Sequence, residues 1–175
     1  MGAEHIGWRY DPIFVDEKYT VKYHLEQFEG ISADLEGYTK NCVISFLDLY
    51  QKVKKNFPEA KMVSKEQRKY LGQRMTRIAT EHKMILRPCG EGTELAAFGA
   101  DCNGCMTQQI YENAIHMSLD MPKKQFLRKE CACYLGNDIG AYNSCPHMCK
   151  YCYANYDEKS VRLNRINHNP KSAFL

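Results

Sequence analysis

The chain has 175 residues, of which 44% are apolar, enough to bury one hydrophobic core, so we expect residues 1–175 to form a single domain. Its formal net charge of +3 is too small to indicate a nucleic-acid-binding protein unless the basic residues are clustered. The longest apolar run, residues 42–47, is too short to span a membrane. Nine cysteines without a signal peptide predict reduced thiols and a cytoplasmic location.

The first part of the chain alternates strand and helix patterns. Residues 5–10 are short and aromatic and precede Asp11-Pro12, which predicts a strand stopped by proline. Residues 20–36 carry apolar side chains at helical spacing and begin with the N-cap residue Thr20, which predicts an amphipathic helix. The β-branched run 42–47 predicts a strand covered on both faces, in which Cys42 is a core residue rather than a ligand.

The middle of the chain continues this alternation. Ser64 and Gln67 form the capping box of a helix that is expected to end near His82 and to carry a solvated basic face. Residues 84–88 predict a third strand, and residues 139–142 predict a fourth.

Strands that alternate with helices predict an α/β fold, here a partial (βα) barrel of the TIM type. Residues 1–100 would supply βα units, and residues 101–175 a cysteine-rich region. A closed parallel barrel has about eight strands, so we expect the chain to be the C-terminal part of a longer barrel. Its first strand would then pair with a missing N-terminal segment or self-associate through an open edge.

Ligands of parallel α/β sheets gather at the carboxyl ends of the strands. Asp11, Asp48, Cys89 and Cys145 each follow a predicted strand, so we expect them to converge on one face. The candidate catalytic residues there are Asp11, Asp48 and Glu91.

The clearest chemical signal is a triplet of thiols, Cys145, Cys149 and Cys152. Thiolates suit iron-sulfur clusters, zinc and Cu(I). Three protein ligands leave one iron of a [4Fe-4S] cluster open to an exogenous ligand, unless a distant residue fills that position. The alternative is a zinc knuckle completed by His147 or by another thiol.

The C-x3-C-x2-C spacing, with Tyr151 just before the third cysteine, resembles the signature of the radical S-adenosylmethionine (SAM) enzymes. The resemblance implies a [4Fe-4S] cluster on the three cysteines, with SAM bound to the fourth iron and cleaved to a 5′-deoxyadenosyl radical. It also implies an electron donor such as a flavodoxin or ferredoxin, and an unknown substrate. Tyr151 and Asn155 would lie near SAM as cofactor-binding residues.

The late position of this motif is unusual for radical SAM enzymes. Together with residues 8–13, 43–48 and 138–143, it resembles an uncharacterised bacterial family of unknown function whose members end in a radical-SAM-like cysteine cluster. The chain resembles the later part of that family only. No reaction is established for the family, so the resemblance implies a site and a fold rather than a substrate.

A second group of cysteines lies between residues 89 and 133. A C-x2-C turn at residues 102–105, in which Gly104 allows the tight bend, is a spacing common in metal sites. The family resemblance implies four ligands of a second iron-sulfur cluster or a zinc, with Cys102 as an alternate: Cys89, Cys105, Cys131 and Cys133. The alternative is that these are loop thiols without a shared function.

Residues 107–119 predict a further helix, and Asp157 caps a basic helix that ends near Asn167. The last helix would bind SAM, a phosphorylated substrate or a nucleic-acid backbone, or would simply be solvated. Three function classes therefore follow from the sequence. They are a radical SAM-type enzyme or its catalytic fragment, an electron-transfer or sensor iron-sulfur protein, and a zinc-stapled interaction or nucleic-acid-binding module.

Overall fold

The structure is a computed structural model that describes residues 2–120, 131, 133 and 140–172. The chain divides into two compact units, and each is built from two separate stretches of sequence. The first unit comprises residues 1–47 and 63–135, and the second comprises residues 48–62 and 136–175. None of the helices in the described ranges combines the length and the apolar character that a membrane crossing requires.

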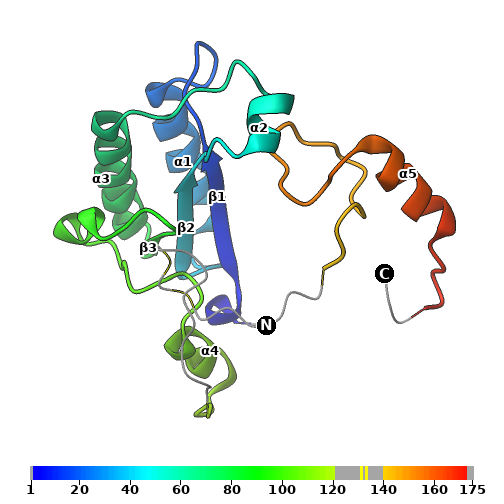
Figure 1. The fold of residues 1–175 in the computed structure, drawn as a ribbon. Helices are drawn as coiled ribbons and strands as arrows, with labels where there is room; N and C mark the ends of the chain where they lie inside the picture. The colour runs from blue at the N-terminus through cyan, green and yellow to red at the C-terminus, as the bar shows by residue number, and fades with distance from the viewer. Residues whose placement is uncertain (1, 121–130, 132, 134–139, 173–175) are drawn as a thin grey trace. The chain divides into compact units, whose positions relative to one another are not determined.

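The first unit is organised around a three-stranded parallel sheet of order β1-β2-β3 (Figure 1). The strands are β1 (Gly7–Ile13), β2 (Asn41–Phe46) and β3 (Ile85–Pro88). Trp8 is paired with Cys42, and Cys42 with Leu86, so the strands run in register across the sheet. The predicted α/β class with parallel βα units is confirmed.

Two long helices, α1 (Val21–Leu35) and α3 (Lys65–Glu81), connect the strands, and their starts are those that the sequence predicts. The Thr20 hydroxyl accepts a hydrogen bond from the backbone of Tyr23 at 3.1 Å, and Ser64 and Gln67 form the predicted capping box. The remaining helices are η1 (Ala3–His5), α2 (Gln51–Asn56), η2 (Glu94–Phe98), α4 (Gln108–Ile115) and α5 (Glu158–Asn167).

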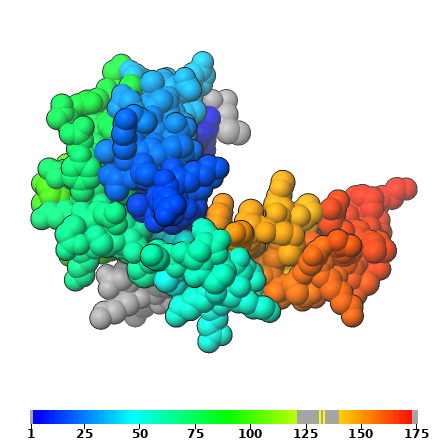
Figure 2. All heavy atoms as spheres, turned by 90° about the horizontal axis from the view of Figure 1, so that it is seen from above, coloured from blue at the N-terminus to red at the C-terminus, as the bar shows by residue number. Residues whose placement is uncertain are grey.

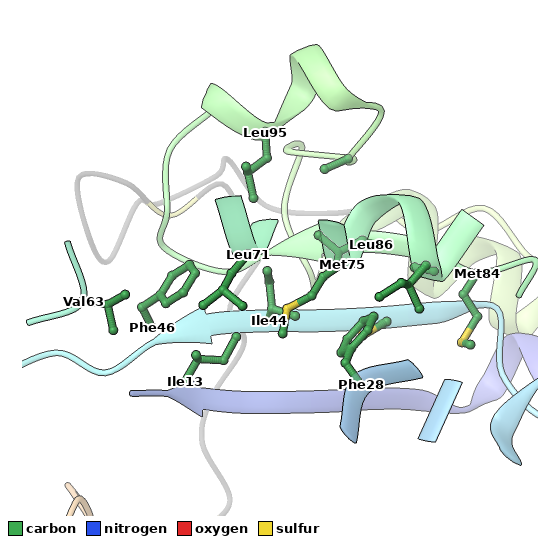
Figure 3. Packing of buried hydrophobic residues seen from close by; sticks show 14 residues of the cluster. Ile13, Phe28, Ile44, Phe46, Val63, Leu71, Met75, Met84, Leu86 and Leu95 are labelled. Atoms are coloured by element: carbon green, nitrogen blue, oxygen red, sulfur yellow. The ribbon is translucent and has the colours of Figure 1, made fainter. Parts of the chain in front are cut away.

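The hydrophobic core lies between α1, α3 and one face of the sheet. Figure 3 shows Met75 of α3 gathered with Ile44 of β2 and Leu86 of β3, all of which are buried. Cys42 is also fully buried in this core, as predicted. Complete burial of a large apolar side chain contributes about 1.5–3 kcal/mol, so this layer supplies most of the stability of the first unit.

A buried histidine, His24, lies in the first turn of α1 at the edge of the core. The Tyr10 hydroxyl lies 2.9 Å from Nδ1 of His24, and Nε2 of His24 lies 2.7 Å from the carbonyl oxygen of Phe14. Nε2 therefore donates to the carbonyl, and Nδ1 accepts from the tyrosine hydroxyl. Burial lowers the pKa of His24, so the neutral ring is the form that fits this site.

We expect the stability of the first unit to fall below about pH 6.5, the ordinary pKa of histidine. The unfolded chain then binds a proton at His24 that the folded chain does not, so stability is complete above this pH and is lost as the pH falls through it. Urea unfolding between pH 5 and 8 measures the effect, and His24→Gln should flatten the slope.

His82 provides the control for this experiment. Contacts with Glu29 and Glu36 raise its pKa, so its contribution to stability has the opposite sign and is lost as the pH rises. His82→Gln should therefore leave the acid-side loss in place. An unchanged acid-side slope in His24→Gln would contradict the assignment to His24.

Three expectations about elements are corrected by the structure. The first strand does not stop at proline: β1 continues through Pro12 to Ile13, and its register with β2 shifts between Tyr10 and Ile13. Pro12 is tolerated because β1 lies at the edge of the described sheet, where the missing N–H removes no ladder bond. The helix expected over residues 107–119 ends at Ile115, where His116 adopts a left-handed backbone with φ of 55°.

The predicted strand at residues 139–142 is the third correction. Gly140 and Ala141 have no regular structure and Tyr142 and Asn143 form a turn, whereas residue 139 lies outside the described residues. The strands that the structure describes make a small, open, three-stranded parallel sheet.

Candidate functional site

The face of the sheet away from the core carries several charged and polar residues. Tyr10, Ile44 and Leu86 pack toward the core, so the alternation of side chains places their strand neighbours on the opposite face. These neighbours include Arg9 and Asp11 of β1, Ser45 of β2 and Arg87 of β3.

Asp11, a candidate catalytic residue, holds Arg9 in place. Its carboxylate accepts hydrogen bonds from Nε and Nη2 of Arg9, at 3.3 and 2.5 Å, and from the Ser45 hydroxyl at 3.1 Å. Burial disfavours the charge of Arg9, but the interaction with Asp11 outweighs it and raises the pKa of Arg9. Arg9 is therefore a fixed positive charge on the polar face.

Arg87 anchors the C-x2-C turn to the same face. Its guanidinium donates hydrogen bonds to the Asp101 carboxylate and to the carbonyl oxygen of Gly104, the latter at 3.3 Å. Asp101 in turn accepts from the backbone of Asn103 at 3.0 Å, and Gly104 has a positive φ of 117°, as expected for this tight bend. These contacts determine where Cys105 lies.

Four thiols come together beside Arg9, and we call them the sheet-face thiols: Cys89, Cys105, Cys131 and Cys133. The sulfurs of Cys105 and Cys133 lie 3.2 Å apart, and the backbone N–H of Cys105 points at the Cys133 sulfur over 3.3 Å. Contact with Cys89, burial and contact with Cys133 raise the pKa of Cys105. Burial and the neighbouring Cys133 raise the pKa of Cys131 in the same way.

Cys102 does not join this group, although it belongs to the same turn. Its side chain packs against the hydrophobic core, and its sulfur lies 3.9 Å from the carbonyl oxygen of Ala100. The structure therefore separates the alternate candidate Cys102 from the other four.

Glu91, the second candidate catalytic residue, has its carboxylate engaged within the first unit. One oxygen accepts from the backbone N–H of Phe46 at 2.8 Å, and the other accepts from Arg68 at 3.0 Å. Both bonds tie the loop after β3 to the end of β2 and to α3. Glu91 therefore fixes the loop that begins at Cys89.

The cysteine triplet lies in the second unit, on a loop held through its backbone. The Asn155 amide donates to the carbonyl oxygen of Cys145 at 2.7 Å, and the Cys152 N–H donates to the carbonyl oxygen of Cys149 at 2.9 Å. Cys145 and Cys149 are exposed, and Cys152 is partly exposed. Asn155 is buried, and its Oδ1 has no hydrogen-bond partner among the described residues.

Lys52 of α2 fastens the end of this loop. Its ammonium donates to the carbonyl oxygens of Tyr153 and Asn155, at 2.7 and 3.0 Å, and lies 3.8 Å from the centre of the Tyr156 ring. Figure 2 shows the loop in orange next to cyan atoms, the colour of residues 48–62. Residues 48–62 and the triplet loop thus form one unit through charge-assisted hydrogen bonds.

Lys52→Met should loosen the triplet loop without unfolding α2. Removing a charged donor from two carbonyls should speed hydrogen exchange in residues 143–156 about tenfold, which corresponds to about 1.4 kcal/mol. Mass spectrometry of peptides from this loop measures the change. Lys54→Met, at an exposed position of the same helix, is the matched control and should leave the exchange rate unchanged.

Asp48, the third candidate catalytic residue, also belongs to the second unit and accepts a hydrogen bond from the Tyr50 hydroxyl at 3.1 Å. Asp11 and Cys89 belong to the first unit, where both contact Arg9. The expected convergence of Asp11, Asp48, Cys89 and Cys145 on one face stays a prediction. Within the described ranges, no three or more His, Cys, Asp or Glu side chains are already arranged to hold a metal ion.

Comparison with known families adds one finding. A family model described as a domain of unknown function (DUF1848) matches residues 1–154. The chain belongs to the DUF1848 family. The predicted membership of an uncharacterised family is confirmed. The part of this DUF1848 chain that matches contains all nine cysteines and stops before α5. No curated protein and no solved structure matches the chain.

Sequence reasoning did not single out two of the residues that build the site, Arg9 and Arg87. The available signal was the presence of charged residues, Arg9 with Asp11 and Arg87, within two short strands whose other residues are mostly apolar or aromatic. Such a residue on a strand that packs against helices indicates a second, polar face of the sheet.

Proposed function

We propose that this DUF1848 protein is an iron-sulfur protein of the radical SAM type. Cys145, Cys149 and Cys152 would hold a [4Fe-4S] cluster, and SAM would occupy the position that three protein ligands leave open. When bound, such a cluster supplies the electron for reductive cleavage of SAM, and the substrate of the reaction is unknown.

The main support for this proposal is the arrangement of the three triplet thiols on a loop that is held through its backbone. Three thiols of spacing C-x3-C-x2-C lie on one loop, and two of the bonds that hold this loop go to the carbonyl oxygens of Cys145 and Cys149, which leaves the sulfurs free of these bonds. The thiols form no disulfide and two of them are exposed, so they are accessible to a metal cluster and to an external ligand.

Two further side chains fit this role. Asn155 fixes the backbone of Cys145 and is therefore a positioning residue for the first ligand. Tyr151 precedes the third cysteine and is 39% exposed, which leaves aromatic surface for contact with the adenine of SAM.

The same proposal extends to the fold of the first unit. We propose that β1, β2 and β3 are βα units of a partial barrel, with α1 and α3 on its outer side. The parallel strand order and the polar second face of the sheet support this arrangement, because barrel enzymes place polar groups at one end of an inner sheet face.

Anaerobic reconstitution with iron and sulfide tests the function. The protein should turn brown and absorb near 400 nm, as iron-sulfur clusters do, and after reduction with dithionite its electron-spin resonance spectrum should change when SAM is added. Dithionite takes the place of the flavodoxin or ferredoxin that would reduce the protein in a cell. If the spectrum of the reduced cluster does not change when SAM is added, the protein is an electron-transfer or sensor protein instead. If the protein binds zinc and no iron, it is a zinc-stapled module.

A further inference from the structure

We infer that the sheet-face thiols Cys89, Cys105, Cys131 and Cys133 are the ligands of a second, closed metal site that binds a thiophilic metal centre, either Zn²⁺ or a [4Fe-4S] cluster. This inference rests on the first unit alone. It does not depend on SAM or on the triplet, which belongs to the second unit.

The distance between the Cys105 and Cys133 sulfurs is close to that expected around a shared zinc ion. The Cys105 and Cys133 sulfurs are 3.2 Å apart, and four thiolates around a tetrahedral zinc, with bonds of about 2.3 Å, place their sulfurs about 3.8 Å apart. Zinc binding therefore requires these two sulfurs to move apart by about 0.6 Å, whereas a [4Fe-4S] cluster, in which each thiolate binds a different iron, requires a larger movement. Cys89 contacts Cys105, and Cys131 interacts with Cys133 and Cys89, so all four thiols belong to one group.

Hydrogen-bond donors already point at the sulfurs. The Cys105 backbone N–H is directed at the Cys133 sulfur, and the Arg9 guanidinium lies 3.9 Å from the Cys105 sulfur and also interacts with Cys89. Thiolate ligands of zinc and of iron-sulfur clusters accept such bonds, which reduce the negative charge that four thiolates bring together. Asp11 keeps the guanidinium in this orientation.

The first unit restrains two of the chain segments that carry these ligands, although the four thiols are not yet arranged around a metal position. Arg87 ties the turn that carries Cys105 to the sheet, and Glu91 ties down the loop that begins at Cys89. Cys131 and Cys133 are each only 4% exposed. Four buried or partly buried thiols leave no position for an exogenous ligand, so the site would be structural or electron-carrying rather than a place where substrate binds the metal.

A triplet-free variant, Cys145→Ala/Cys149→Ala/Cys152→Ala, isolates this site in the full-length chain. After reconstitution with zinc alone, or with iron and sulfide, it should retain about one zinc or about four iron atoms per chain, measured by plasma mass spectrometry. Which of the two metals is retained identifies the centre. In the triplet-free chain, Cys105→Ser should reduce the metal content per chain more than tenfold, whereas Cys102→Ser, in the same turn, should leave the metal content unchanged.

Protection of thiols from alkylation provides a second measurement. It needs no further substitution in the triplet-free chain, so it remains valid if Cys105→Ser or Cys102→Ser fails to fold. In the triplet-free chain, bound metal should protect the four sheet-face thiols from alkylation, and a chelator should expose them together, while Cys102 reacts equally in both conditions. A chain that binds neither metal, or one that loses as much metal in Cys102→Ser as in Cys105→Ser, would overturn the inference. So would a Cys105–Cys133 disulfide in the anaerobically prepared, metal-free chain, which would identify these thiols as a redox pair.

Discussion

Replacing Cys145, Cys149 or Cys152 singly with alanine should abolish the SAM-responsive spectrum entirely. Each cysteine would supply one of only three protein bonds to the cluster, so a single loss leaves two irons without a protein ligand. The measurement is the electron-spin resonance spectrum of the reduced, reconstituted protein with and without SAM. We expect the response to SAM to fall below detection in each of the three variants.

Cys102→Ala is the matched control, because it removes a thiol that packs against the core of the first unit. It should keep the full response to SAM. If any one of the triplet variants retains a SAM-responsive cluster, the assignment of that cysteine is wrong. Iron that remains in these variants without a response to SAM would come from the sheet-face thiols.

Arg87→Met should lower the free energy of unfolding of the first unit by about 3 kcal/mol. The substitution leaves the Asp101 carboxylate without its cationic partner and also removes the bonds to Asn41 and Gly104. Breaking one partner of a buried ion pair costs about 3–5 kcal/mol, and we take the lower end because Asp101 is partly exposed. The fluorescence of Trp8, the single tryptophan, reports unfolding of this unit because its ring stacks on Phe28.

Arg77→Met is the control for this measurement. Arg77 pairs with Glu81 one turn along α3, but both side chains are largely exposed, so the loss of stability should be much smaller than in Arg87→Met. The Arg87→Met/Asp101→Leu double variant should recover part of the stability, because no buried charge is then left unpaired. Equal losses in Arg87→Met and Arg77→Met would show that the Arg87 pair does not hold the unit together.

Arg87→Met should also release the turn that carries Cys105. In the metal-free protein, Cys105 should then react faster with an alkylating reagent, while Cys42 in the core should remain protected. This result would show that the contacts which stabilise the sheet also determine the position of Cys105 among the sheet-face thiols.

The features that the sequence alone determined are local ones. Thr20, Ser64 and Asp157 cap their helices through bonds to backbone atoms three residues away, and such bonds depend on nearby residues only. The burial of Cys42 followed from an apolar, β-branched run. The triplet was visible because its three thiols are close in the sequence.

Tertiary structure decided everything that depends on distant residues. Only the pairing of β1, β2 and β3 reveals that Arg9 and Arg87 share one face of a sheet, since charged residues in short strands have no fixed orientation until a partner strand sets it. β1 runs through Pro12 because the strand lies at an edge, which its own sequence does not state. Cys102 and Cys105 are equivalent in a C-x2-C pattern, yet the anchor of Arg87 on Gly104 turns one toward the other thiols while the second packs into the core.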